Sequence, residues 1–320
     1  MKNEIGGYLE LERFDGSLLH EQALAMESGR ACLAWLIEQK NIRRIALPDF
    51  LCDVVANVCR AEGVQIREYP VGENLLPQNT TPEQGESFYL VNYYGQLTPE
   101  DIAGYRSSGS HLIVDNAQAY FTLPIPGVDT LYTCRKFLGV PDGGFLYTDI
   151  RMKPSERAAS LERMRFVLGR FEQSAGAFYE EASRNNDLLP LQPRRMSALT
   201  ENLLRVVDYE RVQRTRTENY LRLQEALGEM NLLCLHTPEG PYAYPLMLED
   251  ALSCRQELIS QKIFVPQLWP NVIREQPANR TARALAENIL PLPCDQRYGK
   301  EEMEFIAARV RAWQQTRRTA

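Results

Sequence analysis

Between residues 28 and 148, short apolar segments alternate with segments that show helical spacing, and this pattern limits the possible folds more than any other feature of the chain. Helices are predicted for residues 28–41, 52–63 and 98–109. Strands are predicted for residues 43–48, 64–71, 87–95, 111–115, 130–134 and 143–149. Strands that alternate with helices of about a dozen residues favour a mostly parallel sheet with helical crossovers.

Residues 111–115 (HLIVD) show where a ligand site is expected in such a sheet. The segment is apolar almost throughout, as is typical of a strand covered on both faces. Ligands of parallel sheets bind at the carboxyl ends of the strands. Asp115 stands at such an end, and it is therefore a candidate site residue.

The pattern changes after about residue 155. Residues 155–187 are predicted to form one long, charged, amphipathic helix, and 197–228 another that ends at Gly228. Further predicted elements are a helix at 254–263, a strand at 264–270 and a closing helix at 300–315. We therefore expect a large α/β domain over residues 1–205, with an N-terminal arm and a helical connection, and a small α+β domain over residues 206–320.

Composition excludes some classes of function. The chain has 320 residues, of which 44% are hydrophobic and 24% charged, which is ordinary for a globular protein with a substantial core. The net charge is −6 and no long Lys/Arg block occurs, which argues against a nucleic-acid partner. No run of about 18 apolar residues occurs, so no transmembrane helix and no membrane partner are expected. The polar N-terminus does not resemble a signal peptide.

The cysteines and histidines do not suggest a metal site. Seven cysteines are scattered without a CxxC pair, which is typical of reduced thiols in a cytoplasmic protein. The three histidines lie far apart in the sequence, so no histidine-rich metal site is expected.

Lys136 lies in a short segment between two predicted strands, 21 residues after Asp115, and Gly139, Gly143 and Gly144 follow it. A lysine in a pocket can form a Schiff base with an aldehyde, because desolvation favours the free amine. Asp115 could serve instead as a helix cap or an arginine partner, and Lys136 as a surface lysine. Together, however, a lysine and an aspartate are the pair expected to bind pyridoxal 5'-phosphate. The lysine would bind the aldehyde, and the aspartate would bind the ring nitrogen.

The phosphate of such a cofactor needs an anion site. Ser28, Gly29 and Arg30 open a predicted helix, whose first N–H groups and dipole favour an anion. Arg30 and Arg135 could add charge-assisted hydrogen bonds. The alternative is that Ser28 is simply a helix cap.

These segments, in this order, resemble the nucleotide-sugar aminotransferases of the DegT/StrS type, which have the type I fold of pyridoxal-phosphate-dependent enzymes. The resemblance covers most of the chain. Its most specific motif is VDNAQAYF, which ends at Phe121. The other matching segments are SGRACLAWL, PDFLCDVVANVCRAEGVQIREYPV, VNYYGQ, RKFLGVPDGGFLYT, PRRMSALTENLLRVVDYE and LPLPCDQRYGKEEMEFIAARV.

The resemblance implies a role for each matching residue. Lys136 would form the Schiff base and Asp115 would bind the pyridinium nitrogen. Gln118 would bind the phenolic oxygen of the cofactor. The phosphate would be held by Ser28, Gly29, Arg30 and Thr133, and Cys52 would lie against the ring. The family also implies a homodimer in which each active site takes residues from both subunits.

The chain departs from the family pattern at several positions. Cys52 stands where an aromatic residue usually stacks on the cofactor, although Phe50 is two residues away. Arg30 replaces a hydroxyl residue at the phosphate turn. Pro193 replaces an asparagine that the partner subunit supplies. Dehydratases of the family carry histidine in place of the lysine, so Lys136 favours transamination.

The preferred hypothesis is therefore an aminotransferase that takes an amino group from an amino acid such as glutamate and gives it to a keto group. By family analogy, that group belongs to a nucleotide-linked sugar used for polysaccharide or secondary-metabolite synthesis. Tyr8, Asn92 and Tyr94 are candidates for substrate contact, with packing as the alternative for each. Two other readings stay open: a non-catalytic relative that binds a sugar nucleotide or a protein, and a different pyridoxal-phosphate reaction.

Overall fold

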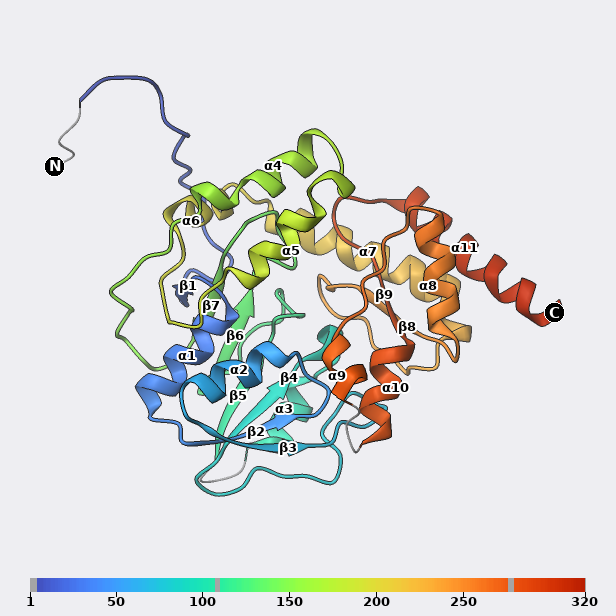
Figure 1. The fold of residues 1–320 in the computed structure, drawn as a ribbon, viewed down its shortest axis with the longest axis horizontal. Coiled ribbons are helices and arrows are strands. Elements are labelled where there is room, and N and C mark those ends of the chain that lie inside the picture. Colours follow the sequence, from blue (N-terminus) through green and yellow to red (C-terminus); the bar gives the residue numbers. More distant parts are fainter. Residues whose placement is uncertain (1–4, 107–109, 276–278, 320) are drawn as a thin grey trace.

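The structure is a computed structural model that describes residues 5–106, 110–275 and 279–319. Seven strands form one sheet in the order β1-β7-β6-β5-β4-β2-β3 (Figure 1). The strands are β1 (Leu24–Met26), β2 (Arg44–Pro48), β3 (Gln65–Tyr69), β4 (Ser87–Val91), β5 (His111–Asp115), β6 (Asp129–Thr133) and β7 (Gly144–Tyr147).

The sheet is mostly parallel, as the sequence predicts. The pairs β2–β3, β2–β4, β4–β5 and β5–β6 are parallel, while β7 runs antiparallel to both β1 and β6. The carboxyl ends of β2, β4, β5 and β6 therefore lie at the same edge of the sheet. Asp115, the last residue of β5, lies at this edge.

Three helices connect the parallel strands and confirm the predicted crossovers. They are α1 (Gly29–Lys40), α2 (Asp53–Ala61) and α3 (Pro99–Tyr105), and the short helix η1 (Tyr93–Gly95) follows β4. The side chain of Thr98 caps α3 by accepting a hydrogen bond from the backbone N–H of Asp101, whose carboxylate accepts one from Thr98 in return. Helix α3 ends earlier than predicted, and residues 107–109 of that prediction lie outside the described part of the chain.

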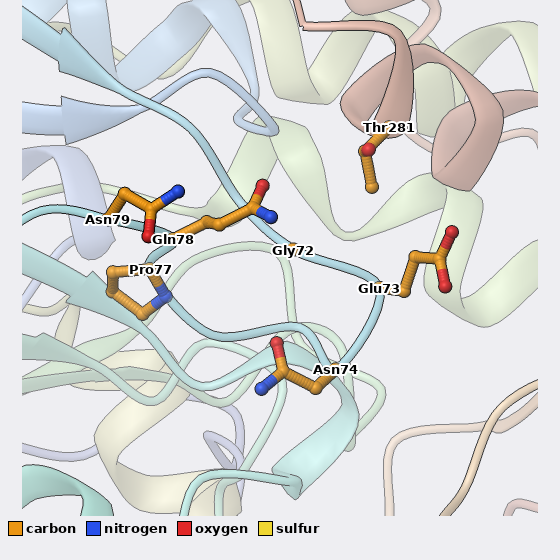
Figure 2. A pocket seen from close by; sticks show the side chains of 7 residues that line it. All are labelled: Gly72, Glu73, Asn74, Pro77, Gln78, Asn79 and Thr281. Atoms are coloured by element: carbon orange, nitrogen blue, oxygen red, sulfur yellow. The ribbon is translucent and has the colours of Figure 1, made fainter.

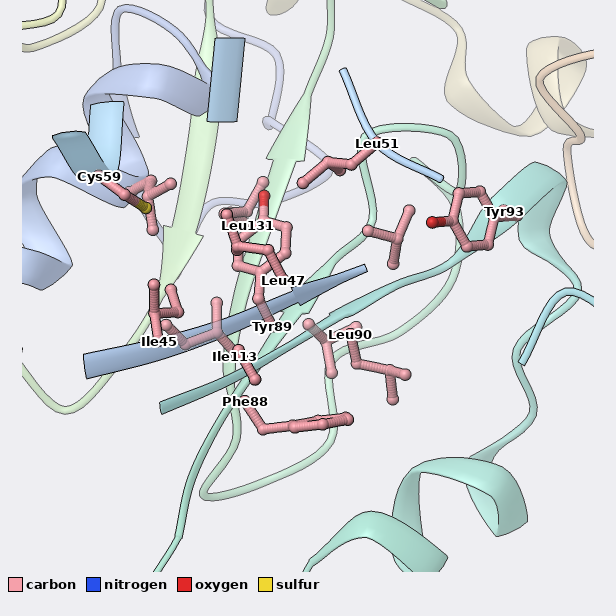
Figure 3. Packing of buried hydrophobic residues seen from close by; sticks show 14 of the residues in the cluster. Ile45, Leu47, Leu51, Cys59, Phe88, Tyr89, Leu90, Tyr93, Ile113 and Leu131 are labelled. Carbon is pink, nitrogen blue, oxygen red and sulfur yellow. The ribbon is translucent and has the colours of Figure 1, made fainter. Parts of the chain in front are cut away.

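Apolar side chains fill the space on both sides of the central strands. Figure 3 shows Ile45 and Leu47 of β2, Phe88 and Leu90 of β4, and Ile113 of β5 packed together. All five residues of β4 are buried, which is typical of a parallel strand covered on both faces.

The predicted long helix at residues 155–187 is wrong. The segment instead contains four short helices that fold back on one another: η2 (Leu161–Arg163), α4 (Arg165–Glu172), η3 (Gly176–Phe178) and α5 (Tyr179–Asp187). Gln173 leaves the helical conformation, with φ −130° and ψ −99°. The ring of Phe178 then packs where a side chain at Gly169 would lie, so the chain turns back on itself.

The predicted helix at 197–228 is also interrupted. It consists of α6 (Ala198–Leu204) and α7 (Tyr209–Leu227), and the η4 turn (Gly228–Met230) follows. Asp208 starts a new helix, because its side chain accepts a hydrogen bond from the backbone N–H of Arg211.

The C-terminal part has a small hydrophobic cluster of its own beside the two-stranded antiparallel sheet β8–β9. Its elements are β8 (Tyr244–Met247), α8 (Ala251–Ser260), α9 (Pro270–Glu275), α10 (Arg280–Asn288), β9 (Ile289–Leu292) and α11 (Lys300–Thr319). The strand predicted at 264–270 is wrong: Pro266 and Pro270 cannot donate ladder hydrogen bonds, and α9 begins at Pro270. Side chains of α9 and α10 join the main core, so the C-terminal part also closes over the large sheet.

Candidate active site

A cavity of about 800 Å³ lies at the carboxyl ends of β4, β5 and β6, beside the beginnings of α1 and α2. The start of α9 lines it as well. All of the cofactor-binding residues that the sequence suggests line this one cavity: Ser28, Gly29, Arg30, Cys52, Asp115, Gln118, Thr133 and Lys136.

Asp115 is a buried carboxylate, 7% exposed, whose two oxygen atoms are both held. The hydroxyl of Tyr89 donates a 2.8 Å hydrogen bond to Oδ2, and the backbone N–H of Ala117 donates a 2.8 Å bond to Oδ1. Burial raises the pKa of Asp115, while the charge of Lys136 and the two hydrogen bonds oppose that rise. Asp115 is therefore a fixed, partly compensated negative charge that a cationic ligand group would stabilise.

Lys136 lies in the loop between β6 and β7, and its side chain is exposed to the cavity. Desolvation by the surrounding protein lowers the pKa of the Lys136 amine. The negative charge of Asp115 is the largest influence that raises this pKa. Lowering the pKa increases the fraction of neutral amine, which is the form that attacks a carbonyl group. The ring of Tyr242 lies 5.6 Å from Nζ of Lys136.

Asp142 fixes the end of this loop. Its buried carboxylate accepts hydrogen bonds from Ser160 Oγ at 2.8 Å, from Ser197 Oγ at 2.9 Å and N–H at 2.8 Å, and from the hydroxyl of Thr200. Hydrogen bonds to an ionised acceptor are roughly twice as strong as neutral ones. The loop that carries Lys136 is thus held to segments later in the chain.

The two glycines after Asp142 allow close packing. Gly143 has φ +118°, a conformation that side chains rarely adopt, and a Cβ there would overlap Sγ of Cys134. A Cβ on Gly144 would lie 2.7 Å from the carbonyl carbon of Ser28. The absence of side chains therefore lets β7 approach the start of α1.

The start of α1 has the features of an anion site. Ser28 Oγ caps the helix by accepting a hydrogen bond from Ala31 N–H at 3.2 Å. Within the described part of the chain, the N–H groups of Gly29 and Arg30 have no hydrogen-bond acceptor. Free N–H groups at the positive end of the helix dipole favour an anion.

Two guanidinium groups lie beside this helix end. Arg30 donates to the carbonyls of Asn186 at 2.7 Å and Leu189 at 3.0 Å, and Arg135 donates to the side chain of Asn186. Neither arginine forms an ion pair with any residue the structure describes, although Asp187 and Asp53 act on the Arg30 pKa from further away. Burial and the neighbouring arginines lower the pKa of Arg135 to about 10. Both guanidinium groups are therefore without a direct carboxylate contact among the described residues.

The preceding residue, Glu27, is fully buried and tied to two other arginines. Arg194 Nε lies 2.8 Å from its carboxylate, and Arg163 lies 3.2 Å from it. Arg194 follows Pro193, the position where the family resemblance would place a partner-subunit residue. The segment thus supports the start of α1 through contacts within the same chain.

Gln118 and Cys52 occupy different walls of the cavity. The side-chain carbonyl of Gln118 accepts a 2.9 Å hydrogen bond from Tyr94 N–H, which leaves the amide NH₂ as a donor at the cavity. Cys52 stands at the start of α2, and burial raises the pKa of its thiol, so the thiol is neutral near pH 7. Thr133 Oγ1 donates to the carbonyl of Gly143 at 3.3 Å.

A second cavity, of about 500 Å³, lies between the loop after β3 and α10. Figure 2 shows its polar side chains, among them Glu73, Asn74 and Gln78. None of the residues predicted for the cofactor lines it. No group of three or more potential metal ligands occurs among the described residues. Of the described helices, none combines the length and the apolar character needed to cross a membrane.

Comparison with solved structures identifies the fold. A DegT DnrJ EryC1 StrS aminotransferase from Brucella abortus matches with a TM-score of 0.64 and 14% identity over 91% of this chain and 85% of that one. DesV from S. venezuelae matches with a TM-score of 0.65 and 15% identity over 91% and 84%. The PMP form of the putative sugar aminotransferase Spr1654 from Streptococcus pneumoniae matches with a TM-score of 0.65 and 14% identity over 91% and 88%. No protein-family profile and no curated protein sequence matches the chain.

The chain has the fold of these aminotransferases. This confirms the predicted fold class, the type I fold of pyridoxal-phosphate-dependent transferases, with a large, mostly parallel sheet and a small C-terminal part. At these identities the likeness establishes the fold alone. The division into domains at residue 206 stays a prediction.

Within this fold, the three residues suggested for substrate contact lie outside the lining of the large cavity. Asn92 is fully buried and bonds Asn116 Oδ1 at 3.0 Å. Tyr94, 1% exposed, orients Gln118 through its backbone N–H. Tyr8 is 99% exposed, on an N-terminal arm that extends away from the body of the molecule (Figure 1).

The cavity also contains residues that local sequence patterns do not single out. Tyr242 faces Lys136, Trp269 and Arg274 come from the segment around α9, and Asn186 bridges the two arginines. The polar composition of residues 269–280 predicts a loop that could approach a substrate, but it does not distinguish Trp269 or Arg274 from their neighbours. Tyr242 has no local signal, because its position depends on contacts with distant segments.

Proposed function

We propose that this chain is an aminotransferase that uses pyridoxal 5'-phosphate and transfers an amino group from an amino acid to a keto group. One observation carries the proposal: Lys136, Asp115 and the cationic start of α1 face a single cavity. The similar folds include an aminotransferase solved in PLP and PMP forms.

The residues present fit this cofactor. Asp115 offers a buried, oriented carboxylate to a protonated ring nitrogen. The free N–H groups of α1, with Arg30 and Arg135, offer a phosphate site in which no described carboxylate forms a direct ion pair with either arginine. The Gln118 amide offers a donor to a phenolic oxygen. Cys52 supplies a smaller contact surface than an aromatic ring would.

The cofactor, when bound, stabilises negative charge on the substrate carbon next to the nitrogen. Lys136 Nζ would act as the proton carrier in the cavity, taking the proton from the substrate carbon and delivering it to the cofactor carbon on the other side of the nitrogen. Desolvation keeps the amine closer to neutrality and suits it to this role. Asp115 would hold the ring-nitrogen proton, and Tyr89 would keep its carboxylate aligned.

We further propose that the acceptor is a keto group on a nucleotide-linked sugar, in polysaccharide or secondary-metabolite biosynthesis in the cytoplasm, with glutamate as the expected donor. Sugar aminotransferase CalS13 from Micromonospora echinospora is among the similar folds, with a TM-score of 0.61 and 12% identity over 92% of this chain and 88% of that one. The cavity also extends past the cofactor residues to Trp269 and Arg274. An aromatic ring and a cation suit a base or sugar and a diphosphate.

Exposed apolar residues support a homodimer with shared active sites. On the N-terminal arm, Ile5 is 102%, Tyr8 99% and Leu9 93% exposed. Phe171 of α4 is 91% and Tyr179 of α5 is 73% exposed. Burial of apolar side chains of this size against a second subunit would stabilise a dimer. Tyr8 could then reach the neighbouring active site.

A non-catalytic binding role is the competing hypothesis. Its specific support is that Arg30 is already engaged with the carbonyls of Asn186 and Leu189, and that Cys52 replaces an aromatic contact. A third possibility is another pyridoxal-phosphate reaction in the same cavity. These hypotheses differ in whether the cofactor becomes attached and whether an amino donor converts it.

The test is to add pyridoxal phosphate to the purified protein, remove the excess, and record visible absorption before and after glutamate, with Lys136→Ala as control. Borohydride reduction and mass spectrometry then locate the attached cofactor. We expect attachment at Lys136, and loss of the visible band with glutamate. No attachment in the wild type would refute the proposal. Attachment that neither glutamate nor any other amino acid alters would favour another reaction.

A further inference from the structure

Arg216, in the middle of α7, is a buried cation that the proposed chemistry does not use. It is 1% exposed, and its guanidinium lies 4.7 Å from the centre of the Phe137 ring. A buried charge is costly unless it is fully hydrogen-bonded. The hydrogen-bond partners of Arg216 therefore indicate which parts of the structure this residue holds in place.

The partners of Arg216 belong to two separate segments beside the cavity. Its Nη2 donates to the carbonyl of Phe137 at 3.0 Å, and its Nη1 donates to the carbonyls of Pro241 at 2.9 Å and Tyr242 at 3.3 Å. Phe137 is the residue next to Lys136. Arg216 thus bridges the lysine loop and the segment that carries Tyr242.

Gln296 strengthens this bridge from the C-terminal part. Its carbonyl oxygen accepts a 2.7 Å hydrogen bond from Arg216 Nε, and its amide donates a 2.8 Å bond to the carbonyl of Phe137. The Phe137 carbonyl therefore has two donors. The forked guanidinium can hold several acceptors in a fixed geometry, which a lysine cannot do.

We propose that Arg216 is a positioning residue that holds the ring of Tyr242 against the amine of Lys136 and so keeps this side of the cavity closed. The proposal builds on the proposed function, because it gives Lys136 a role. Tyr242 lies 5.6 Å from Nζ of Lys136 and lines the cavity. If the two segments separated, the Tyr242 ring would move away from the amine and water would take its place.

The readout is the pH at which Lys136 becomes reactive, measured on cofactor-free protein with an amine-directed reagent and mass spectrometry. The other groups that act on this amine are Asp115 of β5, Cys52 before α2, and Arg135 in the same loop, and the variants leave all three unchanged. Because the measurement needs no cofactor, it gives a result even if the proposed function fails.

We expect Arg216→Met to raise the midpoint pH of Lys136 labelling toward that of an ordinary lysine, because desolvation by the surrounding protein lowers it in the wild type. Arg216→Lys should give an intermediate midpoint. Tyr242→Phe, which keeps the ring, should leave it unchanged. In the loaded protein, Arg216→Met should weaken cofactor binding about tenfold, the lower end of the scale known for residues that orient the ligands of a metal ion.

The matched control is Arg255→Met in α8. Arg255 also bonds a carbonyl, that of Val265 at 2.9 Å, and a glutamine, Gln267 at 2.7 Å, but it does not line the cavity. Its loss should not move the Lys136 midpoint. If Arg216→Met does not fold, Gln296→Leu removes part of the same bridge without removing the charge. The proposal is wrong if the Arg216 or Gln296 variant folds and labels Lys136 at the wild-type midpoint.

Discussion

The hydroxyl of Tyr89 on β4 donates a 2.8 Å hydrogen bond to the buried carboxylate of Asp115 on the neighbouring strand β5. The two side chains line the same cavity, so the hydrogen bond orients the charge that would face the cofactor ring. Parallel pairing of β4 with β5 creates this contact, and nothing in either segment alone predicts it.

Tyr89→Phe should therefore reduce amino transfer about tenfold, the loss expected for a hydrogen bond to a charged group. The carboxylate would lose one of its two partners, and its pKa would rise further. The measurement is kcat with glutamate at saturating cofactor. Tyr209→Phe is the control, because that hydroxyl bonds the carbonyl of Leu204 at 2.8 Å and does not line the cavity. Equal losses in both variants would contradict the proposed role of Tyr89.

Arg135→Gln should weaken binding of pyridoxal phosphate about tenfold or more, since charge-assisted hydrogen bonds to phosphate are among the strong ones. It should leave the binding of pyridoxal, which lacks the phosphate, nearly unchanged. Both affinities can be measured by absorption titration. Inorganic phosphate should compete with the cofactor in the wild type and less well in the variant. A parallel loss for both ligands would instead indicate a general distortion of the cavity.

Arg274→Ala should raise KM for an anionic acceptor about tenfold while changing kcat little, because a cavity-lining cation that binds a remote substrate group contributes mainly to uniform binding. The difference in KM between the variant and the wild type should decrease at high salt, because salt screens the charge interaction. Arg280→Ala is the control, since Arg280 is exposed at the start of α10 and does not line the cavity. An unchanged KM for every anionic acceptor would exclude this role.

Gly143→Ala should destabilise the protein by about 1–3 kcal/mol, because an alanine would be strained at φ +118° and its Cβ would overlap Sγ of Cys134. Adding Cys134→Ala should recover only part of the loss, since it removes the overlap and not the backbone strain. Urea unfolding of the single and double variants gives the free energies. Full recovery in the double variant would show that the backbone conformation costs nothing.

His20 should make the stability depend on pH below 6.5. Burial lowers its pKa from 6.5 to about 4, and its hydrogen bond to the carbonyl of Tyr120 opposes this only in part. Between these pH values the unfolded state binds the proton more readily than the folded state does. The stability that is present above pH 6.5, where His20 is neutral in both states, is therefore lost as the pH falls toward 4. This pKa shift corresponds to a loss of about 3 kcal/mol in the free energy of unfolding.

Urea unfolding of the wild type and His20→Gln at pH 7, 5.5 and 4.5 tests this. The variant cannot take up the proton, and its amide can still donate to the Tyr120 carbonyl. Its free energy of unfolding should fall less steeply with pH than that of the wild type. Parallel pH profiles would show that His20 does not titrate in this range.

Local patterns determined the helix that begins after Ser28, the strand that ends at Asp115, and the loop that carries Lys136. These features depend on caps, apolar runs and turn residues within a few positions of one another, so they can be predicted from the sequence. Because parallel strands end at one edge of the sheet, the order of the elements also predicted that Asp115 would face a ligand site.

Only the tertiary structure decided the interruption near Gln173, the absence of a strand at 264–270, and the placement of Tyr242 and Arg216. The helix turns back at Gln173 where Phe178 packs over Gly169, a contact that periodicity cannot reveal. Tyr242 reaches Lys136 because Arg216, far from both in the sequence, bonds the segments of each. Such hydrogen bonds join residues with no local pattern in common, so they emerge only when the chain has closed around the cavity.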